Sequence, residues 1–127
     1  MQGKLILIVD DNEKNVKLAR DVLRFAGFRT LEARTGREGV SLAAEHLPDV
    51  ILMDIRLPDM EGTAAMRELR NDARTARIPV VAVTSFAMKG DHARFIGEGF
   101  DGYLEKPISV REFPEQVRSY CGPTEAD

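Results

Sequence analysis

The chain has 127 residues, and its 43% hydrophobic and 31% charged residues are typical of one soluble globular domain. A single cysteine excludes an internal disulfide. No apolar run reaches the roughly 18 residues of a membrane span, and the sequence starts without a signal segment, so we expect a cytoplasmic protein with no membrane partner. Eighteen basic against 21 acidic residues give a net charge of −3 without a lysine or arginine block, so no nucleic-acid partner is expected.

The first half of the chain predicts three strands and two helices. The segments 4–9 and 50–54 contain unbroken apolar runs, at 5–9 and 50–53, which indicate strands that are buried on both faces. Asn12 is suited to cap the helix after the first run, where apolar residues recur at helical spacing. The predicted order is a strand at 4–9, a helix between Asn12 and Gly27, a strand at 30–33, a helix that begins with the capping box of Thr35 and Glu38 and ends near residue 46, and a strand at 50–54.

The second half continues this alternation. Pro79 stands at the entry of an apolar run, where its missing N–H is tolerated. Ser109 and Glu112 form a capping box, but Pro114 would remove a hydrogen bond inside that helix, so we expect the helix to start late, near Pro114. The predicted order is a helix after Gly62 that ends in the polar segment 71–77, a strand at 78–83, a helix at 91–98 with Ala93 and Ile96 facing inward, a strand at 102–104, and a helix to about Cys121.

Five strands that alternate with helical patterns predict an α/β domain with a parallel sheet, because parallel strands need crossover connections. The sequence has no internal repeat and no linker. We therefore expect a single domain over residues 1–122 and a flexible acidic tail over residues 123–127.

Polar side chains stand where the predicted strands end. Asp10 and Asp11 follow the first strand, Asp54 ends the third, Thr84 follows the fourth and Lys106 follows the fifth. The carboxyl ends of parallel strands share one edge of the sheet, so we expect these side chains to lie together. Three carboxylates in one pocket repel each other unless a cation is present. Oxygen ligands favour Mg²⁺ over zinc, so we expect a magnesium site.

This set of groups is sufficient for phosphoryl transfer, which needs mainly positioning and neutralisation of charge. Asp54 would be the nucleophile and would become an aspartyl phosphate. Lys106 would neutralise a phosphoryl oxygen, and Thr84 would donate a hydrogen bond from its hydroxyl.

The segments around Asp54 and Thr84, together with Lys106 and Pro107, resemble the receiver domain of two-component response regulators. The resemblance covers nearly the whole chain. The intervals are also similar to those of the family: 43 residues from Asp11 to Asp54, 30 from there to Thr84 and 22 from there to Lys106.

The segments 84–91 and 106–110 look most like the single-domain DivK type of regulator. The family resemblance implies a flavodoxin-like (CheY-like) doubly wound sheet of five parallel strands in the order 2-1-3-4-5, flanked by five helices. It also implies a cis peptide bond between Lys106 and Pro107.

The resemblance further implies that Asp54 accepts a phosphoryl group from a histidine kinase or a histidine phosphotransfer protein. By the same analogy, Mg²⁺ is bound by Asp11, by Asp54 and by the backbone carbonyl of Arg56, with Asp10 contributing through water.

Thr84 and Tyr103 are similar to the switch pair of the family. A downstream protein partner is then expected to bind the face made by the last two helices and the strand between them. In this interpretation the chain is not an enzyme in the usual sense, because it catalyses only its own phosphorylation and dephosphorylation.

Three alternatives remain open at the level of sequence. A metal-dependent phosphohydrolase with an aspartate nucleophile usually has a second acid two residues later, where this chain has Arg56. A nucleotide or flavin binder should have a glycine-rich loop after the first strand, where this chain has acidic residues. The chain could also be the receiver of a hybrid histidine kinase.

Overall fold

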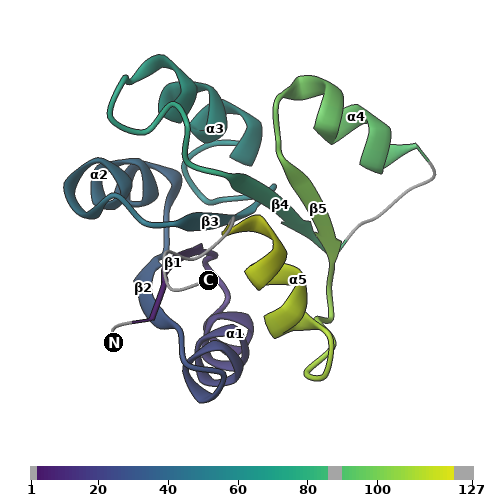
Figure 1. Ribbon diagram of the computed structural model, residues 1–127. Coiled ribbons are helices and arrows are strands. Elements are labelled where there is room, and N and C mark those ends of the chain that lie inside the picture. The colour runs from purple at the N-terminus through teal and green to yellow at the C-terminus, as the bar shows by residue number, and fades with distance from the viewer. Residues whose placement is uncertain (1–2, 86–89, 122–127) are drawn as a thin grey trace.

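The computed structural model describes residues 3–85 and 90–121, and the predicted tail at 123–127 lies outside this part. Five strands and five helices alternate along the described chain (Figure 1). The strands are β1 (Leu5–Val9), β2 (Arg29–Ala33), β3 (Val50–Asp54), β4 (Val80–Thr84) and β5 (Gly102–Glu105). The helices are α1 (Glu13–Phe25), α2 (Gly36–His46), α3 (Gly62–Asn71), α4 (Asp91–Glu98) and α5 (Phe113–Tyr120).

All strand pairs are parallel, and the sheet order is β2-β1-β3-β4-β5. The predicted fold class and strand order are therefore confirmed. One row of paired residues crosses the whole sheet, and it consists of Ala33, Val9, Met53, Ala82 and Tyr103. Because paired residues point to the same face, Tyr103 at the edge strand belongs to the same layer as the central methionine.

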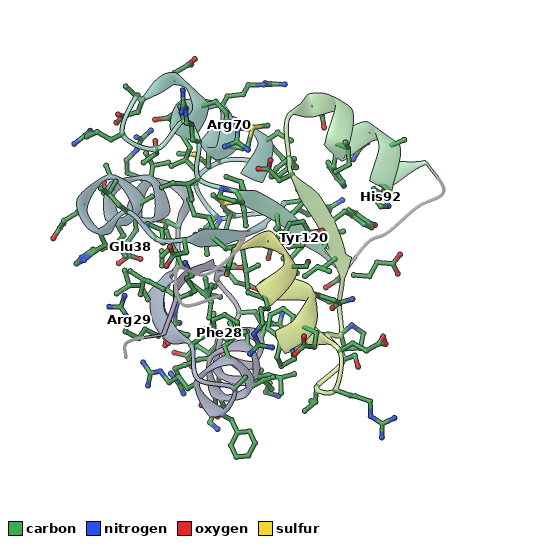
Figure 2. All side chains as sticks on the ribbon, viewed as in Figure 1. Phe28, Arg29, Glu38, Arg70, His92 and Tyr120 are labelled. Atoms are coloured by element: carbon green, nitrogen blue, oxygen red, sulfur yellow. The ribbon has the colours of Figure 1, made fainter. Side chains whose placement is uncertain are left out.

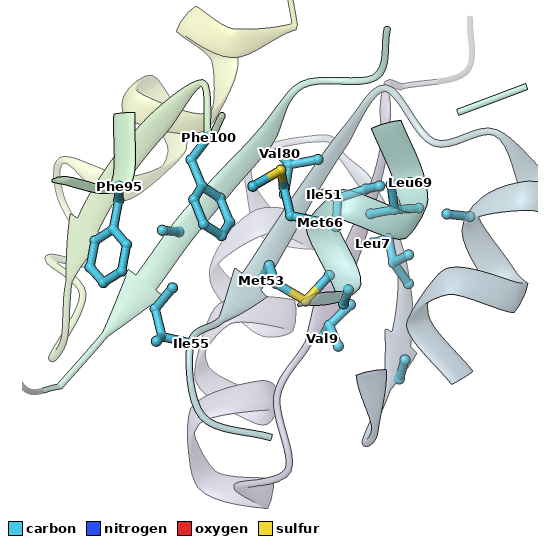
Figure 3. Close-up of a cluster of buried hydrophobic side chains, with 14 residues drawn as sticks. Leu7, Val9, Ile51, Met53, Ile55, Met66, Leu69, Val80, Phe95 and Phe100 are labelled. Carbon is cyan, nitrogen blue, oxygen red and sulfur yellow. The ribbon is translucent and has the colours of Figure 1, made fainter. Parts of the chain in front are cut away.

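Helices cover both faces of the sheet, and each layer has its own apolar cluster. α2, α3 and α4 lie on one face, and the cluster beneath them includes Met53, Met66 and Phe95 (Figure 3). α1 and α5 lie on the other face over a second cluster, to which they contribute Leu23 and Phe113. Burial of each such side chain contributes about 1.5–3 kcal/mol, so the two layers supply most of the stability.

The helix starts follow the local rules that the sequence suggested. The Asn12 side chain accepts hydrogen bonds from the N–H groups of Lys14 and Asn15 at 3.0 and 3.1 Å. The Thr35 hydroxyl accepts one from the Glu38 N–H at 3.0 Å. These bonds satisfy amides at the starts of α1 and α2 that have no partner within the helix.

Pro114 lies in the first turn of α5, so the predicted late start of that helix is confirmed. A proline is tolerated there because the first N–H groups of a helix have no intrahelical acceptor. The fourth strand starts later than predicted, at Val80 instead of residue 78. The Ile78 N–H closes a turn by donating to the Thr75 carbonyl, and Pro79 has no N–H for the sheet.

The predicted inward face of the helix at 91–98 is wrong. Ala93 is exposed and Ile96 is 40% exposed, whereas Asp91 and Phe95 face inward. Phe95 and Ile96 are neighbours, so a helix can turn only one of them to the core. Phe95 takes this place because its ring packs on Phe100 and Tyr103.

Within the described residues, no helix is long and apolar enough to cross a membrane.

Candidate phosphoacceptor site

The sequence-predicted residues meet at the carboxyl edge of the sheet. Asp10 directly follows β1, Asp54 is the last residue of β3, and Lys106 directly follows β5. The Lys106 ammonium donates to Asp10 Oδ2 at 2.6 Å and to Asp54 Oδ2 at 3.1 Å. One lysine therefore joins carboxylates 96 and 52 residues away in sequence, and the predicted convergence is confirmed for Asp10, Asp54 and Lys106.

A third carboxylate completes an acidic cluster. One oxygen each from Asp10, Asp11 and Asp54 lie within 4.8 Å of one another. Asp10 is buried and Asp54 is half-buried, while Asp11 is exposed to water. Hard oxygen donors that leave part of the coordination sphere to water are the ligands that Mg²⁺ prefers, so the donor set fits this ion.

The electrostatics of the cluster show a surplus of negative charge. Burial raises the pKa of Asp54 above its usual value, and the Asp10 charge adds to this, although Lys106 opposes it. Burial acts to lower the pKa of Lys106, but its hydrogen bonds to the two aspartates and their charges outweigh burial and raise that pKa. The lysine is thus held in its charged form, and the site still carries more acid than base.

Backbone groups fix the carboxylates of Asp10 and Asp54. The Asn12 N–H donates to Asp10 Oδ1 at 2.9 Å, and the Arg56 N–H donates to Asp54 Oδ1 at 3.2 Å. Each aspartate thus binds a backbone amide through Oδ1 and Lys106 through Oδ2. The backbone of Arg56 lies beside Asp54, and the Arg56 side chain is exposed.

Gly62 is a site residue that the sequence analysis placed only as the start of a helix. A Cβ at this position would lie 2.3 Å from the Asp54 carbonyl oxygen and 2.9 Å from Ile55 Cα. Its N–H donates to the Ile55 carbonyl at 2.6 Å. Only glycine lets the start of α3 pack this closely against the backbone of Asp54.

Asp59 was missed by the sequence analysis. Its carboxylate accepts hydrogen bonds from the N–H groups of Gly36 and Arg37 at 2.8 and 2.9 Å. Both bonds lower the pKa of Asp59, and the bond from Arg37 has the larger effect. It thereby ties the loop after β3 to the start of α2. An aspartate after proline indicates a turn or a cap, but the sequence does not show that Asp59 caps α2, which precedes it in the chain.

Thr84 and Tyr103 lie on one face of the sheet. Tyr103 pairs with Ala82, two residues before Thr84, so both side chains project to the α4 side. Thr84 is buried and lines a cavity of about 490 Å³ together with Arg56 and Phe95. Tyr103 is half-buried and packs on Phe95, away from the acidic cluster.

The Lys106–Pro107 peptide bond is cis, as the resemblance implied.

The chain matches the family model described as response regulator receiver domain over residues 6–118. It is 48% identical to the polar-differentiation response regulator DivK of Brucella ovis over 94% of this chain and 97% of that protein. The predicted similarity to receivers, and to the DivK type, is confirmed. These relatives give no support to the phosphohydrolase alternative.

Solved structures agree with this assignment. The receiver domain of the sensor histidine kinase PA1611 from Pseudomonas aeruginosa, described with a magnesium ion coordinated in its active site cleft, is 34% identical, with a TM-score of 0.86 over 95% of this chain and 99% of that chain. A CheY-like receiver domain protein from Methanospirillum hungatei is 29% identical, with a TM-score of 0.83 over 94% of each chain.

Proposed function

The chain belongs to the response regulator receiver domain family, and we propose that its Asp54 accepts a phosphoryl group in a Mg²⁺-dependent reaction. The observation that carries this proposal is the acidic cluster of Asp10, Asp11 and Asp54 bridged by Lys106. The donor is a phosphohistidine of a histidine kinase or of a phosphotransfer protein.

In the transfer step, a carboxylate oxygen of Asp54 forms a bond to phosphorus while the bond between phosphorus and the donor imidazole nitrogen breaks. The imidazole nitrogen keeps the electron pair of the broken bond. Lys106 is already within hydrogen-bond distance of Asp54, so it can neutralise an oxygen of the incoming group. Asp11, Asp54 and the Arg56 carbonyl would hold Mg²⁺, with Asp10 contributing through water, and the ion would supply charge neutralisation at the phosphoryl oxygens.

Thr84 and Tyr103 carry the signal away from the acceptor. A phosphoryl group adds about two negative charges and new acceptor oxygens at Asp54, which attract the Thr84 hydroxyl. Tyr103 follows on the same face of the sheet and changes the surface formed by α4, β5 and α5. A protein partner reads that surface, so the domain of residues 1–122 acts as a cytoplasmic signalling protein and turns over no external substrate.

The direct test is transfer of labelled phosphate from a panel of purified histidine kinases. We expect rapid, stoichiometric labelling of the wild-type chain by a cognate kinase, complete loss of label in Asp54→Asn, and loss on chelation of Mg²⁺. Asp21→Asn, which alters an exposed aspartate on α1, is the matched control and should be labelled normally. Labelling of Asp54→Asn at the wild-type level would refute the proposal.

The partner proposal has its own test. The wild-type chain loaded with beryllofluoride and Mg²⁺, a stable mimic of the phosphorylated state, should retain a partner in a pull-down that the unloaded chain and Asp54→Asn do not. Release of phosphate from a small phosphate ester over many turnovers would instead favour the phosphohydrolase alternative.

A further inference from the structure

Three aromatic rings are stacked where α4 packs against β5. The Tyr103 ring lies 5.4 Å from the His92 ring and 5.6 Å from the Phe95 ring, centroid to centroid, with interplanar angles of 20° and 23°. Phe95 is 3% exposed and also makes an edge contact with Phe100. His92 is exposed near the start of α4 (Figure 2). The stack therefore joins the core to the surface through Tyr103.

The two neighbours of Tyr103 differ in how firmly they are held. Phe95 is fixed in the core cluster beneath α4, whereas His92 lines an open cavity of about 420 Å³. Tyr103, Glu105 of β5 and Gln116 of α5 line the same cavity. The tyrosine ring thus has space beside it, and a movement of the ring into that space would change its contact with His92.

We propose that His92 is a positioning residue for Tyr103: the imidazole holds the tyrosine ring in its present place, and a proton on the imidazole strengthens this hold. The proposal rests on the proposed function, because it concerns how Tyr103 responds to a phosphoryl group on Asp54. Such stacked pairs bias an equilibrium by about 2- to 10-fold. If loading of Asp54 moves Tyr103, loss of the His92 contact must favour the loaded form by the same factor.

The sign of the pH effect follows from the charges around the stack. An imidazole gains its proton between about pH 8 and 5, and a cation over an aromatic face is attracted to it. On α4, Arg94 lies 4.5 Å above the Phe95 ring and is 3.6 Å from Asp91. On β5, Glu105 adds a negative charge, and the neighbouring side chain of α5, Gln116, is neutral. Acid pH therefore strengthens the contact between His92 and Tyr103.

The first measurement follows the Tyr103 ring by NMR in protein labelled with ring-¹³C tyrosine. The chain has two tyrosines, so Tyr120→Phe assigns the two signals. We expect the Tyr103 signal of the unloaded protein to shift with pH in step with the His92 imidazole signal. His92→Phe keeps a ring at this position but cannot titrate, so the pH dependence should disappear. His46→Gln, which removes the other histidine, should leave it intact. The inference is overturned if the Tyr103 signal does not change with pH, or if His92→Ala leaves the position of that signal unchanged.

The second measurement titrates the protein with beryllofluoride in the presence of Mg²⁺. It records the beryllofluoride concentration at which the Tyr103 NMR signal reaches its position in the loaded protein. We expect His92→Ala to need about 2- to 10-fold less beryllofluoride than the wild-type chain, and His92→Phe to restore the wild-type value. If loading does not move Tyr103 in the wild-type chain, the switch role in the proposed function fails, and this inference fails with it. If loading moves Tyr103 but His92→Ala needs the wild-type concentration, this inference alone is overturned.

Discussion

Two cation-centred clusters stand at opposite edges of the sheet, and they differ in their balance of charge. At the carboxyl edge, Lys106 bridges Asp10 and Asp54, and Asp11 completes a cluster of three acids. At the amino edge, Arg70 of α3 is paired with Asp101, which directly precedes β5 (Figure 2).

The Arg70 cluster is matched in charge and in hydrogen bonds. Its guanidinium donates to Asp101 Oδ2 at 2.5 Å, and the same oxygen accepts the N–H of Val80 at 2.9 Å. The Nη1 and Nη2 groups of Arg70 also donate to the backbone carbonyls of Ala76, Ile78 and Gly99. This cluster ties α3 to the starts of β4 and β5, and it has no unmet charge.

The comparison teaches how to separate a functional ion cluster from a structural one. Both join elements that are distant in sequence, so convergence alone does not distinguish them. The surplus acid at the carboxyl edge, visible in the raised pKa of Asp54, destabilises the cluster, so a bound cation would stabilise it. The balanced cluster gains nothing from such a ligand.

Removal of the lysine should give the largest change in stability. In Mg²⁺-free buffer, Lys106→Met should lower the free energy of unfolding by about 3 kcal/mol, because two carboxylates lose their buried cation. Mg²⁺ should restore part of this loss. Urea unfolding monitored by circular dichroism, with and without Mg²⁺, measures both values. An equal loss in the two buffers would contradict the account of surplus charge.

Removal of the arginine at the opposite edge should cost somewhat less. Arg70→Met should lower the free energy of unfolding by about 2 kcal/mol, because a charged donor set and its acceptors lose their hydrogen bonds. The same urea experiment should show this loss unchanged by Mg²⁺, and phosphotransfer to the variant should remain. If Mg²⁺ reversed this loss of unfolding free energy, the two clusters would be energetically coupled, and the distinction between them would be contradicted.

Neutralisation of Asp54 should change the free energy of unfolding in the other direction, towards a more stable protein. Because the pKa of Asp54 is raised in the fold, its charge costs stability at neutral pH. Asp54→Asn should therefore raise the free energy of unfolding of the Mg²⁺-free protein. Thermal unfolding should also show a much smaller increase in Tm on addition of Mg²⁺ than in the wild-type chain. A full Mg²⁺ response would exclude Asp54 as a ligand.

The smallest effect should come from Asp59, whose lowered pKa has the opposite sign from that of Asp54. Its carboxylate stabilises the fold fully above the ordinary pKa of 3.8 and loses this contribution as pH falls through the lower folded-state value. Wild-type and Asp59→Asn proteins should therefore differ most near neutral pH and converge in strong acid. Urea midpoints measured as a function of pH test this, and a gap that widens on acidification would contradict it.

The sequence predicted the strands and most of the site because both depend on local patterns. Apolar runs without alternation located β1, β3 and β4, and the residues at their ends gave Asp10, Asp54 and Thr84. Asp59 and Arg70 had no such signal, because a capping or bridging role depends on which distant amide or carbonyl lies nearby. The orientation of α4 was also missed, since Phe95 and Ile96 are equally apolar neighbours.

The sequence by itself determined the α/β order and the acidic residues at the strand ends, because strand burial and helix caps are encoded over a few residues. Only the tertiary structure decided that Lys106 bridges Asp10 and Asp54, that Gly62 packs against the acceptor backbone, and that His92 stacks on Tyr103. Those contacts depend on crossover connections that bring together residues from distant parts of the chain, and their distances are set by the packing of whole helices on the sheet.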